Sequence, residues 1–327
     1  MPKVVVVFTG GTISMRFDPV AGGAVPSLDG AGILARTPGL DTIAEVEPVD
    51  WGLVPASHLS FAQLLDLIRT VRDALARPDV DGVVVVQGTD TIEETAFALD
   101  LLTPGNKPVV VTGAMRNAGE EGYEGPVNLR AAVRVAAAPE LLGQGALVVL
   151  DGRILPADDP TKTHTDSYGT FQALNTGSLG VVNPSGWVVA RKRTGRRLIA
   201  TMPTVAAEPI PIVVAAIGID GSAVRLLNAG SPRGFVIAAT GAGNTHPDLL
   251  QACRERMEEG LPVVLTTRAP SGRAHPAYGF PGGGVSWARA GAIFGGYLGA
   301  PKARIALALG LGAGLDDPGL RALFADP

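Results

Sequence analysis

Short runs of β-branched residues that end at glycine or proline alternate along this chain with longer segments of helical periodicity. Runs such as Val4–Phe8 and Gly82–Gln87 are apolar throughout, which is typical of parallel strands buried on both faces between helices. The alternation of such strands with helices predicts an α/β fold. The sequence contains no internal repeat of fixed period.

The expected elements form two groups, separated by a turn-rich stretch. The first group has a well-marked helix over Phe61–Ala76, in which Leu64, Leu67, Ile68, Val71 and Leu75 lie on one stripe. Its other elements are strands at Val4–Phe8, Gly82–Gln87, Pro108–Thr112 and Ala146–Asp151 and helices near Ile92–Leu102 and Pro126–Ala138. The second group has strands at Ile212–Ile219, Gly234–Thr240 and Pro262–Thr267 and helices near Asp248–Glu258 and Pro301–Leu311.

Two domains are expected from the 327 residues, at about 150 residues per domain. We place a larger N-terminal parallel-sheet domain at 1–185, a linker at 186–210 and a smaller C-terminal α/β domain at 211–327. The linker contains the basic residues 191–193 and 196–197, which would suit either a nucleic-acid patch or a solvated linker face. Because the chain has 27 basic against 31 acidic residues, a net charge of −4, we favour the solvated face and expect no nucleic-acid partner.

Cysteine and histidine usage bears on compartment and metal content. Cys253 is the only cysteine, so no internal disulfide forms, and the four widely spaced histidines give no metal-ligand pattern. The first residues run directly into an apolar stretch too short for a secretory signal, and no apolar run approaches the roughly 18 residues of a membrane span. We therefore expect a cytoplasmic protein without a membrane contact or a metal site.

The turn after the first expected strand is Thr9-Gly10-Gly11-Thr12-Ile13-Ser14. In an open parallel sheet, ligands bind outside the carboxyl ends of the strands, which is where this turn lies. Paired glycines allow a sharp turn and the close approach of a ligand to backbone N–H groups, and Thr12 presents a hydroxyl. A glycine turn that only connects strand to loop, or a phosphate cradle, remains an alternative for this motif alone, although neither GxGxxG nor GxxxxGK[ST] occurs.

The second turn, Gln87 to Thr95, follows an apolar strand and opens a helix. Thr91 and Glu94 have capping-box spacing, so we expect the Thr91 side chain to accept a hydrogen bond from the Glu94 N–H. That leaves Thr89 and Asp90 at the strand end without a structural duty. A reactive hydroxyl beside a carboxylate that binds a substrate cation fits them, and chance placement of polar residues is the alternative.

A third polar segment, 158–166, sets Lys162 among hydroxyl and carboxylate side chains. A buried lysine with a lowered pKa accepts a proton from a hydroxyl, whereas an exposed one is a solvated charge, and this segment alone favours the exposed lysine. Taken together, the three segments supply hydroxyls, a lysine, a carboxylate and backbone N–H donors. That set suffices for acyl transfer from an amide through a threonine nucleophile.

Four motifs in this order resemble the bacterial-type L-asparaginase family over nearly the whole chain. They are Thr9-Gly10-Gly11-Thr12-Ile13, Gly88-Thr89-Asp90-Thr91-Ile92-Glu93-Glu94-Thr95, Gly113-Ala114-Met115-Arg116 and Thr161-Lys162-Thr163. The resemblance implies hydrolysis of L-asparagine, with L-glutamine as a further possible substrate, by a homotetramer of intimate dimers that needs no cofactor. The lack of a signal segment resembles the cytoplasmic type I branch.

The resemblance also assigns roles to single residues. Thr12 resembles the primary nucleophile, and Thr89, Lys162 and Asp90 resemble the second threonine–lysine–aspartate group. Asp90 would also bind the substrate's α-amino group. The other substrate-binding positions are Ser57 for the α-carboxylate, Ala114, whose carbonyl would accept from the side-chain amide, and Gly11, His58 and Gly88.

Three positions depart from the family pattern. The loop after the first strand commonly carries a tyrosine, but residues 14–30 have none, and Phe17 is their only aromatic residue. We expect this loop, from Ser14 to about Ser27, to act as a hinged lid over Thr12. In the family, the neighbouring subunit usually contributes an asparagine to the site. Here the segment 241–246 places His246 at that position, with Asn244 nearby as a second candidate. The neighbouring subunit sometimes also contributes a glutamate, and no glutamate aligns within 271–280.

Two other functions share these motifs. One is the related subunit that releases ammonia from glutamine or asparagine for a tRNA-dependent amidotransferase. The other is a non-catalytic amino-acid sensor of the same fold. The sensor is disfavoured by the presence of Thr12, Thr89 and Lys162, since a binding protein needs the carboxylate but neither a nucleophile nor its base.

Overall fold

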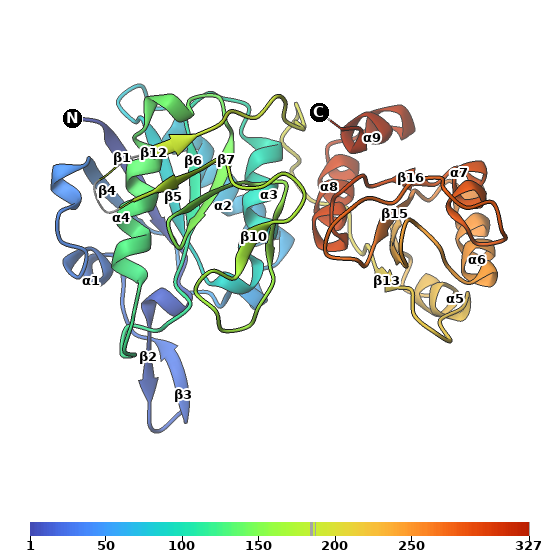
Figure 1. The fold of residues 1–327 in the computed structure, drawn as a ribbon, viewed down its shortest axis with the longest axis horizontal. Coiled ribbons are helices and arrows are strands. Elements are labelled where there is room, and N and C mark those ends of the chain that lie inside the picture. Colours follow the sequence, from blue (N-terminus) through green and yellow to red (C-terminus); the bar gives the residue numbers. More distant parts are fainter. Residues whose placement is uncertain (184–185, 187, 327) are drawn as a thin grey trace. The chain divides into compact units, whose positions relative to one another are not determined.

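The computed structural model describes residues 1–183, 186 and 188–326, and it divides into two compact units (Figure 1). One unit ends at Arg196 and the other begins at Arg197. The domain boundary expected at 185 and the chain end at 327 lie outside the described residues. Each unit has its own sheet flanked by helices, so the α/β fold predicted from the sequence is confirmed.

The first unit contains an eight-stranded sheet in the order β12-β11-β8-β7-β6-β5-β1-β4. Its strands are β1 (Lys3–Phe8), β4 (Glu45–Asp50), β5 (Gly82–Val86), β6 (Val109–Thr112), β7 (Ala146–Leu150), β8 (Arg153–Pro156), β11 (Gly180–Val182) and β12 (Val188–Ala190). Neighbouring strands pair in parallel along the run β4-β1-β5-β6-β7. β8, β11 and β12 continue the sheet with antiparallel pairing. The four strands predicted from valine-rich runs, β1, β5, β6 and β7, are neighbours at its centre.

Four helices of this unit cover the sheet: α1 (Gly30–Ala35), α2 (Phe61–Ala76), α3 (Ile92–Leu102) and α4 (Gly125–Ala136). α1 and α4 share a buried cluster with alternate strand residues such as Val84 and Val86. The residues between them, such as Val85, point to the other face and are equally buried, because α2 and α3 pack there. Ser60 and Gln63 form a capping box that fixes the start of α2.

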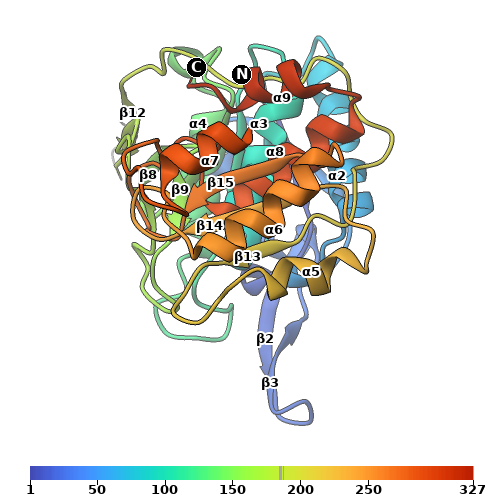
Figure 2. The ribbon, with the colours of Figure 1, turned by 90° about the vertical axis from the view of Figure 1, so that its right-hand side faces the viewer.

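The segment expected as a lid is a β-hairpin, not an irregular loop. Strands β2 (Met15–Asp18) and β3 (Gly23–Pro26) pair antiparallel, and both views show the hairpin projecting from the rest of the first unit (Figures 1 and 2). Phe17 and Val20 are exposed on it. A second small antiparallel pair, β9 (Pro160–Lys162) and β10 (Phe171–Ala173), carries Lys162.

The expectation of a solvated linker is wrong for the first part of the basic stretch, residues 188–196. β12 belongs to the large sheet, and the side chains of Arg193 and Arg196 are 7% and 10% exposed. Both guanidinium groups lie 3.0 Å from the carboxylate of Asp100, which is itself buried in α3. Buried arginines require such partners, so these residues join the end of the first unit to its core.

The second unit contains a four-stranded parallel sheet in the order β13-β14-β15-β16, of which Figure 2 labels the first three strands. Its elements are β13 (Ile212–Val214), α5 (Ser222–Asn228), β14 (Phe235–Ala239), α6 (Pro247–Glu258), β15 (Val263–Thr267), α7 (Gly284–Ala290), β16 (Ile293–Phe294), α8 (Ala300–Gly312) and α9 (Asp317–Phe324). The three strands expected here are present. The first is shorter than the predicted Ile212–Ile219, because the chain leaves the sheet after Val214 and exposes Ile217 fully.

Candidate active site

The turns that follow β1 and β5 are in direct backbone contact. Gly11 has a φ of 93°, and a Cβ atom there would lie 2.1 Å from the backbone nitrogen of Gly88. No residue with a side chain fits such a position. Gly11 therefore brings the 3₁₀ turn Thr12–Ser14 against the 3₁₀ turn Thr89–Thr91.

Thr89 and Asp90 lie beside Lys162. The Lys162 ammonium donates to Thr89 Oγ1 at 3.0 Å and to Asp90 Oδ1 at 2.7 Å. Thr89 is buried, whereas the Asp90 side chain is 66% exposed and can meet a ligand from outside. The lysine side chain is 19% exposed, so the exposed lysine favoured from its segment alone is wrong.

Thr91 lies at the start of α3 as predicted, but its side chain makes no capping hydrogen bond. Its hydroxyl instead accepts from Gln87 Nε2 at 3.0 Å and donates to the Ala56 carbonyl at 3.1 Å. The expected bond from the Glu94 N–H is therefore wrong, because the Ala56 carbonyl lies within reach of the same hydroxyl. Thr91 joins the turn after β5 to the 3₁₀ turn Ala56–His58.

Ser57 and His58 are both exposed on that third turn. A Cβ atom on Gly88 would lie 3.0 Å from Ala56 Cβ and 3.2 Å from Gly11 Cα, so Gly88 sits where the three turns meet. The glycines at 11 and 88 thus act as close-packing positions. The turns that carry Thr12, Ser57 and Asp90 therefore lie close together.

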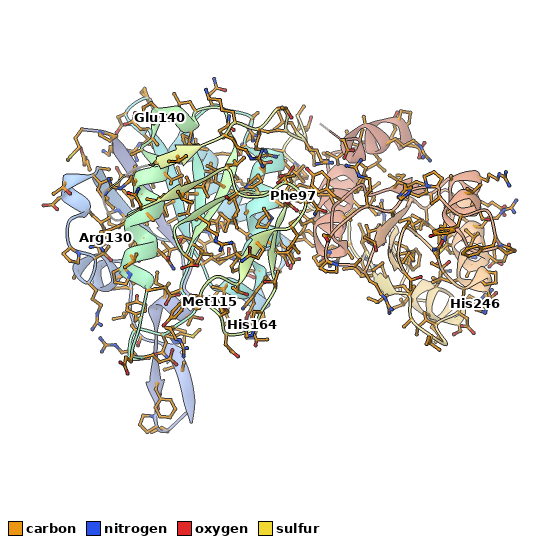
Figure 3. All side chains as sticks on the ribbon, viewed as in Figure 1. Phe97, Met115, Arg130, Glu140, His164 and His246 are labelled. Carbon is orange, nitrogen blue, oxygen red and sulfur yellow. The ribbon has the colours of Figure 1, made fainter. Side chains whose placement is uncertain are left out.

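Ala114 is buried on the turn that follows β6. Asn128 of α4 donates through Nδ2 to the Gly113 carbonyl at 3.0 Å and accepts from the Asp151 N–H at 3.2 Å. In Figure 3 the label on Met115 marks this turn, and His164 lies in the loop after β9. Asn128 thereby fixes the backbone that precedes Ala114 and joins it to the turn after β7.

Sequence reasoning missed Gln87, Asn128, Tyr123 and Glu124. Gln87 directly precedes the Gly88 motif, and its position at a strand end was a usable signal. Asn128 lies inside a helix, where an asparagine has no local function, and its burial becomes evident only in the structure. Tyr123 carries no sequence signal, since it donates to the carbonyl of Ile13, 110 positions away. Glu124 accepts from the N–H groups of Met115 and Arg116, and no local pattern marks that contact.

Backbone N–H groups complete the first unit's site. In the described part of the chain, no group accepts a hydrogen bond from the N–H of Thr12 or of Thr89. Ser14 has turned its hydroxyl inward, where it donates to the Gly11 carbonyl at 2.7 Å. Two N–H donors and a threonine hydroxyl on adjoining turns are the groups that an acyl-transfer site needs.

Asn244 and His246 belong to the second unit. The buried Oδ1 atom of Asn244 has no hydrogen-bond partner among the described residues. His246, labelled in Figure 3, is exposed and caps α6, since its Nδ1 atom accepts from the Asp248 N–H at 3.2 Å. An orphaned buried amide oxygen indicates a missing partner, whereas the histidine already has a structural role.

The described residues offer neither a metal-ligand cluster nor a membrane-spanning helix. Over 1–183, 186 and 188–326, no three His, Cys, Asp or Glu side chains are placed to hold a metal ion. Within those ranges, no helix has the length and apolar composition required to cross a bilayer.

Two family models match this chain. The model described as "Asparaginase, N-terminal" matches residues 3–194, and the model described as "Glutaminase/Asparaginase C-terminal domain" matches residues 210–324. A probable L-asparaginase of Deinococcus radiodurans is 36% identical, covering 99% of this chain and 97% of the relative. An L-asparaginase of Bacillus licheniformis is 31% identical, covering 94% of each chain.

A solved structure and a further relative are also similar to this chain. The structure of a probable cytoplasmic L-asparaginase from Campylobacter jejuni has a TM-score of 0.87 and 26% identity, and the match covers 99% of both chains. A probable periplasmic L-asparaginase of Haemophilus influenzae is 31% identical, over 100% of this chain and 93% of the relative. The similar proteins therefore include both cytoplasmic and periplasmic forms.

Proposed function

This chain belongs to the bacterial-type L-asparaginase family, and we propose that its Thr12 and the group Thr89–Lys162–Asp90 carry out the hydrolysis of L-asparagine to L-aspartate and ammonia. The observation that carries the proposal is the pair of hydrogen bonds from Lys162 to Thr89 and Asp90. Thr89 and Asp90 lie on a turn whose backbone contacts the turn of Thr12. The family and the contacts together make the chain an amidohydrolase that acts on a linear amide.

Acylation begins at Thr12. Its Oγ attacks the side-chain carbonyl carbon of the substrate, the carbon–nitrogen bond breaks, and the hydroxyl proton leaves with the amine as ammonia. The N–H groups of Thr12 and Thr89, which have no acceptor among the described residues, stabilise the developing oxyanion. The product of this step is an ester between Thr12 and the aspartyl group.

Deacylation uses Thr89 and Lys162. A water molecule attacks the ester carbon, and the water proton passes to the Thr12 oxygen as the carbon–oxygen bond breaks. Thr89, hydrogen-bonded to Lys162 at 3.0 Å, orients this water and relays its proton. Asp90 neutralises the lysine and, through its exposed carboxylate, binds the α-amino group of the substrate.

Substrate orientation comes from the remaining turns. The exposed Ser57, with His58 beside it, binds the α-carboxylate, and the carbonyl of Ala114 accepts from the side-chain amide. Gly11 and Gly88 let the backbone approach the substrate. These assignments follow the family motifs and the meeting of the turns at Gly88.

The site is shared between subunits in this proposal. Asn244 has a buried amide oxygen with no partner among the described residues, which suits a residue that completes its contacts only in an assembly. The working form is a homotetramer of intimate dimers, and the cytoplasm is its location. His246 is retained as a second candidate, although its ring already caps α6.

Ammonia release from L-asparagine, L-glutamine and D-asparagine by the purified protein tests this function. We expect fast release from L-asparagine and little from D-asparagine, whose α-amino group would miss Asp90. Faster release from L-glutamine would favour the amidotransferase subunit. Binding of L-asparagine without any release would favour the sensor.

A further inference from the structure

Tyr123 joins two segments that are 110 residues apart. Its hydroxyl donates to the backbone carbonyl of Ile13 at 2.8 Å. Burial raises the pKa of Tyr123 to about 12, so the phenol stays protonated and remains a donor throughout the neutral range. The bond therefore holds the residue that follows Thr12 at any pH at which an enzyme of this kind would operate.

The carbonyl groups of the Thr12 turn show what this bond completes. Gly11 O accepts from the Ser14 N–H and hydroxyl, and Thr12 O accepts from the Met15 N–H. Ile13 O accepts from Tyr123. Every carbonyl from 11 to 13 is thus fixed, and the last of them is fixed from another part of the chain.

Tyr123 is itself anchored on the side of Ala114. Its neighbour Glu124 accepts hydrogen bonds from the Met115 N–H and, at 3.3 Å, from the Arg116 N–H. A Cβ atom on Gly125 would lie 2.4 Å from the Tyr123 ring, so the start of α4 has room for that ring only because residue 125 is glycine. Residues 123–124 therefore connect the turn of Thr12 to the turn of Ala114.

We propose that Tyr123 is a positioning residue: by holding the Ile13 carbonyl, it sets the orientation of the Thr12 hydroxyl relative to the substrate carbonyl bound beside Ala114. The inference rests on the proposed function of Thr12. Tyr123 touches neither substrate nor reacting atoms, and it acts through the Ile13 peptide. A misplacement of the nucleophile of about 1 Å costs up to a hundredfold in rate, which is why one backbone bond matters here.

Tyr123→Phe removes the hydroxyl and keeps the ring, which packs against the core cluster of this unit. Tyr168→Phe is the matched control, because it also removes one tyrosine hydroxyl that bonds a backbone carbonyl. The Tyr168 hydroxyl donates to the Gly122 carbonyl at 3.0 Å. The readouts are kcat and KM for L-asparagine, the melting temperature, and hydrogen exchange of the amides of residues 12–15.

For Tyr123→Phe we expect kcat to fall by about tenfold, with KM changed less than about twofold and the melting temperature close to wild type. Exchange at residues 12–15 should be faster than in wild type and in Tyr168→Phe. Unchanged kcat, or a fall in kcat that Tyr168→Phe reproduces, would overturn the proposal. A loss that follows a lowered melting temperature would also overturn it.

The wild-type protein separates this inference from the proposed function. If wild type releases no ammonia from L-asparagine, the proposed function fails, and exchange at residues 12–15 still decides whether Tyr123 holds the turn. If wild type is active and Tyr123→Phe matches it, only the positioning role fails.

Discussion

The ammonium group of Lys162 lies 3.0 Å from the Thr89 hydroxyl oxygen, although 73 positions separate the two residues. Lys162 comes from a short antiparallel pair, β9–β10, and Thr89 from the end of the central strand β5. The contact changes how the lysine is interpreted. Considered with its own segment alone, it resembles a solvated charge, but its contacts with Thr89 and Asp90 fit the proposed threonine–lysine–aspartate group.

The pairing predicts that Lys162→Met and Thr89→Val each lower turnover by at least about a hundredfold. Their double variant should be no worse than either single variant, because groups that act as one unit are not additive. Steady-state ammonia release measures this, and Lys192→Met, on an exposed lysine, is the control. Multiplied losses in the double variant would contradict the pairing.

A shared site predicts complementation between subunits. Thr12→Ala and Asn244→Ala should each be inactive, and mixing them after dissociation should restore activity, because each mixed dimer then holds one intact site. His246→Ala should mainly destabilise α6, whose cap it removes. An Asn244→Ala protein with wild-type kcat, or a monomer in light scattering that is fully active, would show that the site is not shared.

The β2–β3 hairpin is expected to close over Thr12. Arg16→Ala and Phe17→Ala should lower kcat/KM for L-asparagine, because Arg16 attracts the substrate carboxylate and Phe17, 64% exposed, has apolar surface to bury on closure. Bound L-aspartate should slow proteolysis within residues 15–26. Leu226→Ala, on an exposed leucine of α5, is the control. Equal cleavage with and without L-aspartate, together with unchanged kinetics, would rule out a lid.

The buried ion pairs at the end of the first unit predict an effect on stability. Arg193 contacts Asp100 and Asp158, each at 3.0 Å, and all three side chains are at most 7% exposed. Arg193→Met should lower the free energy of unfolding by about 3 kcal/mol, because it removes the guanidinium that two buried carboxylates share, although Arg196 still contacts Asp100. Urea unfolding measures the change. Arg254→Met, which breaks the exposed pair with Glu258, should have little effect, and equal changes in both variants would contradict this account.

The sequence was sufficient to predict the central strands and the turns after them. β1, β5, β6 and β7 come from apolar runs whose periodicity is local, and Gly11, Thr12, Thr89 and Asp90 follow two of those strands directly. The information for these features lies within a few residues. That is why the fold and the first members of the site were recognisable.

Long-range contacts were not predictable in this way. The hydroxyl of Thr91 was expected to accept from the nearby Glu94 N–H, but it accepts from Gln87 and donates to the distant Ala56 carbonyl. Arg193 lies in a basic, turn-rich stretch that is typical of a linker, but its side chain is buried against Asp100. In each case the deciding partner is brought near by tertiary packing, which a local pattern does not encode.

The rate of ammonia release from L-asparagine by Thr12→Ala tests the central claim most directly. The claim predicts a rate at least about a hundredfold below wild type, with an unchanged melting temperature and retained binding of L-aspartate, because the variant lacks the nucleophile and keeps the binding turns. Thr12→Ser, which keeps a hydroxyl, should retain part of the rate. A Thr12→Ala protein that releases ammonia at close to the wild-type rate would contradict the account.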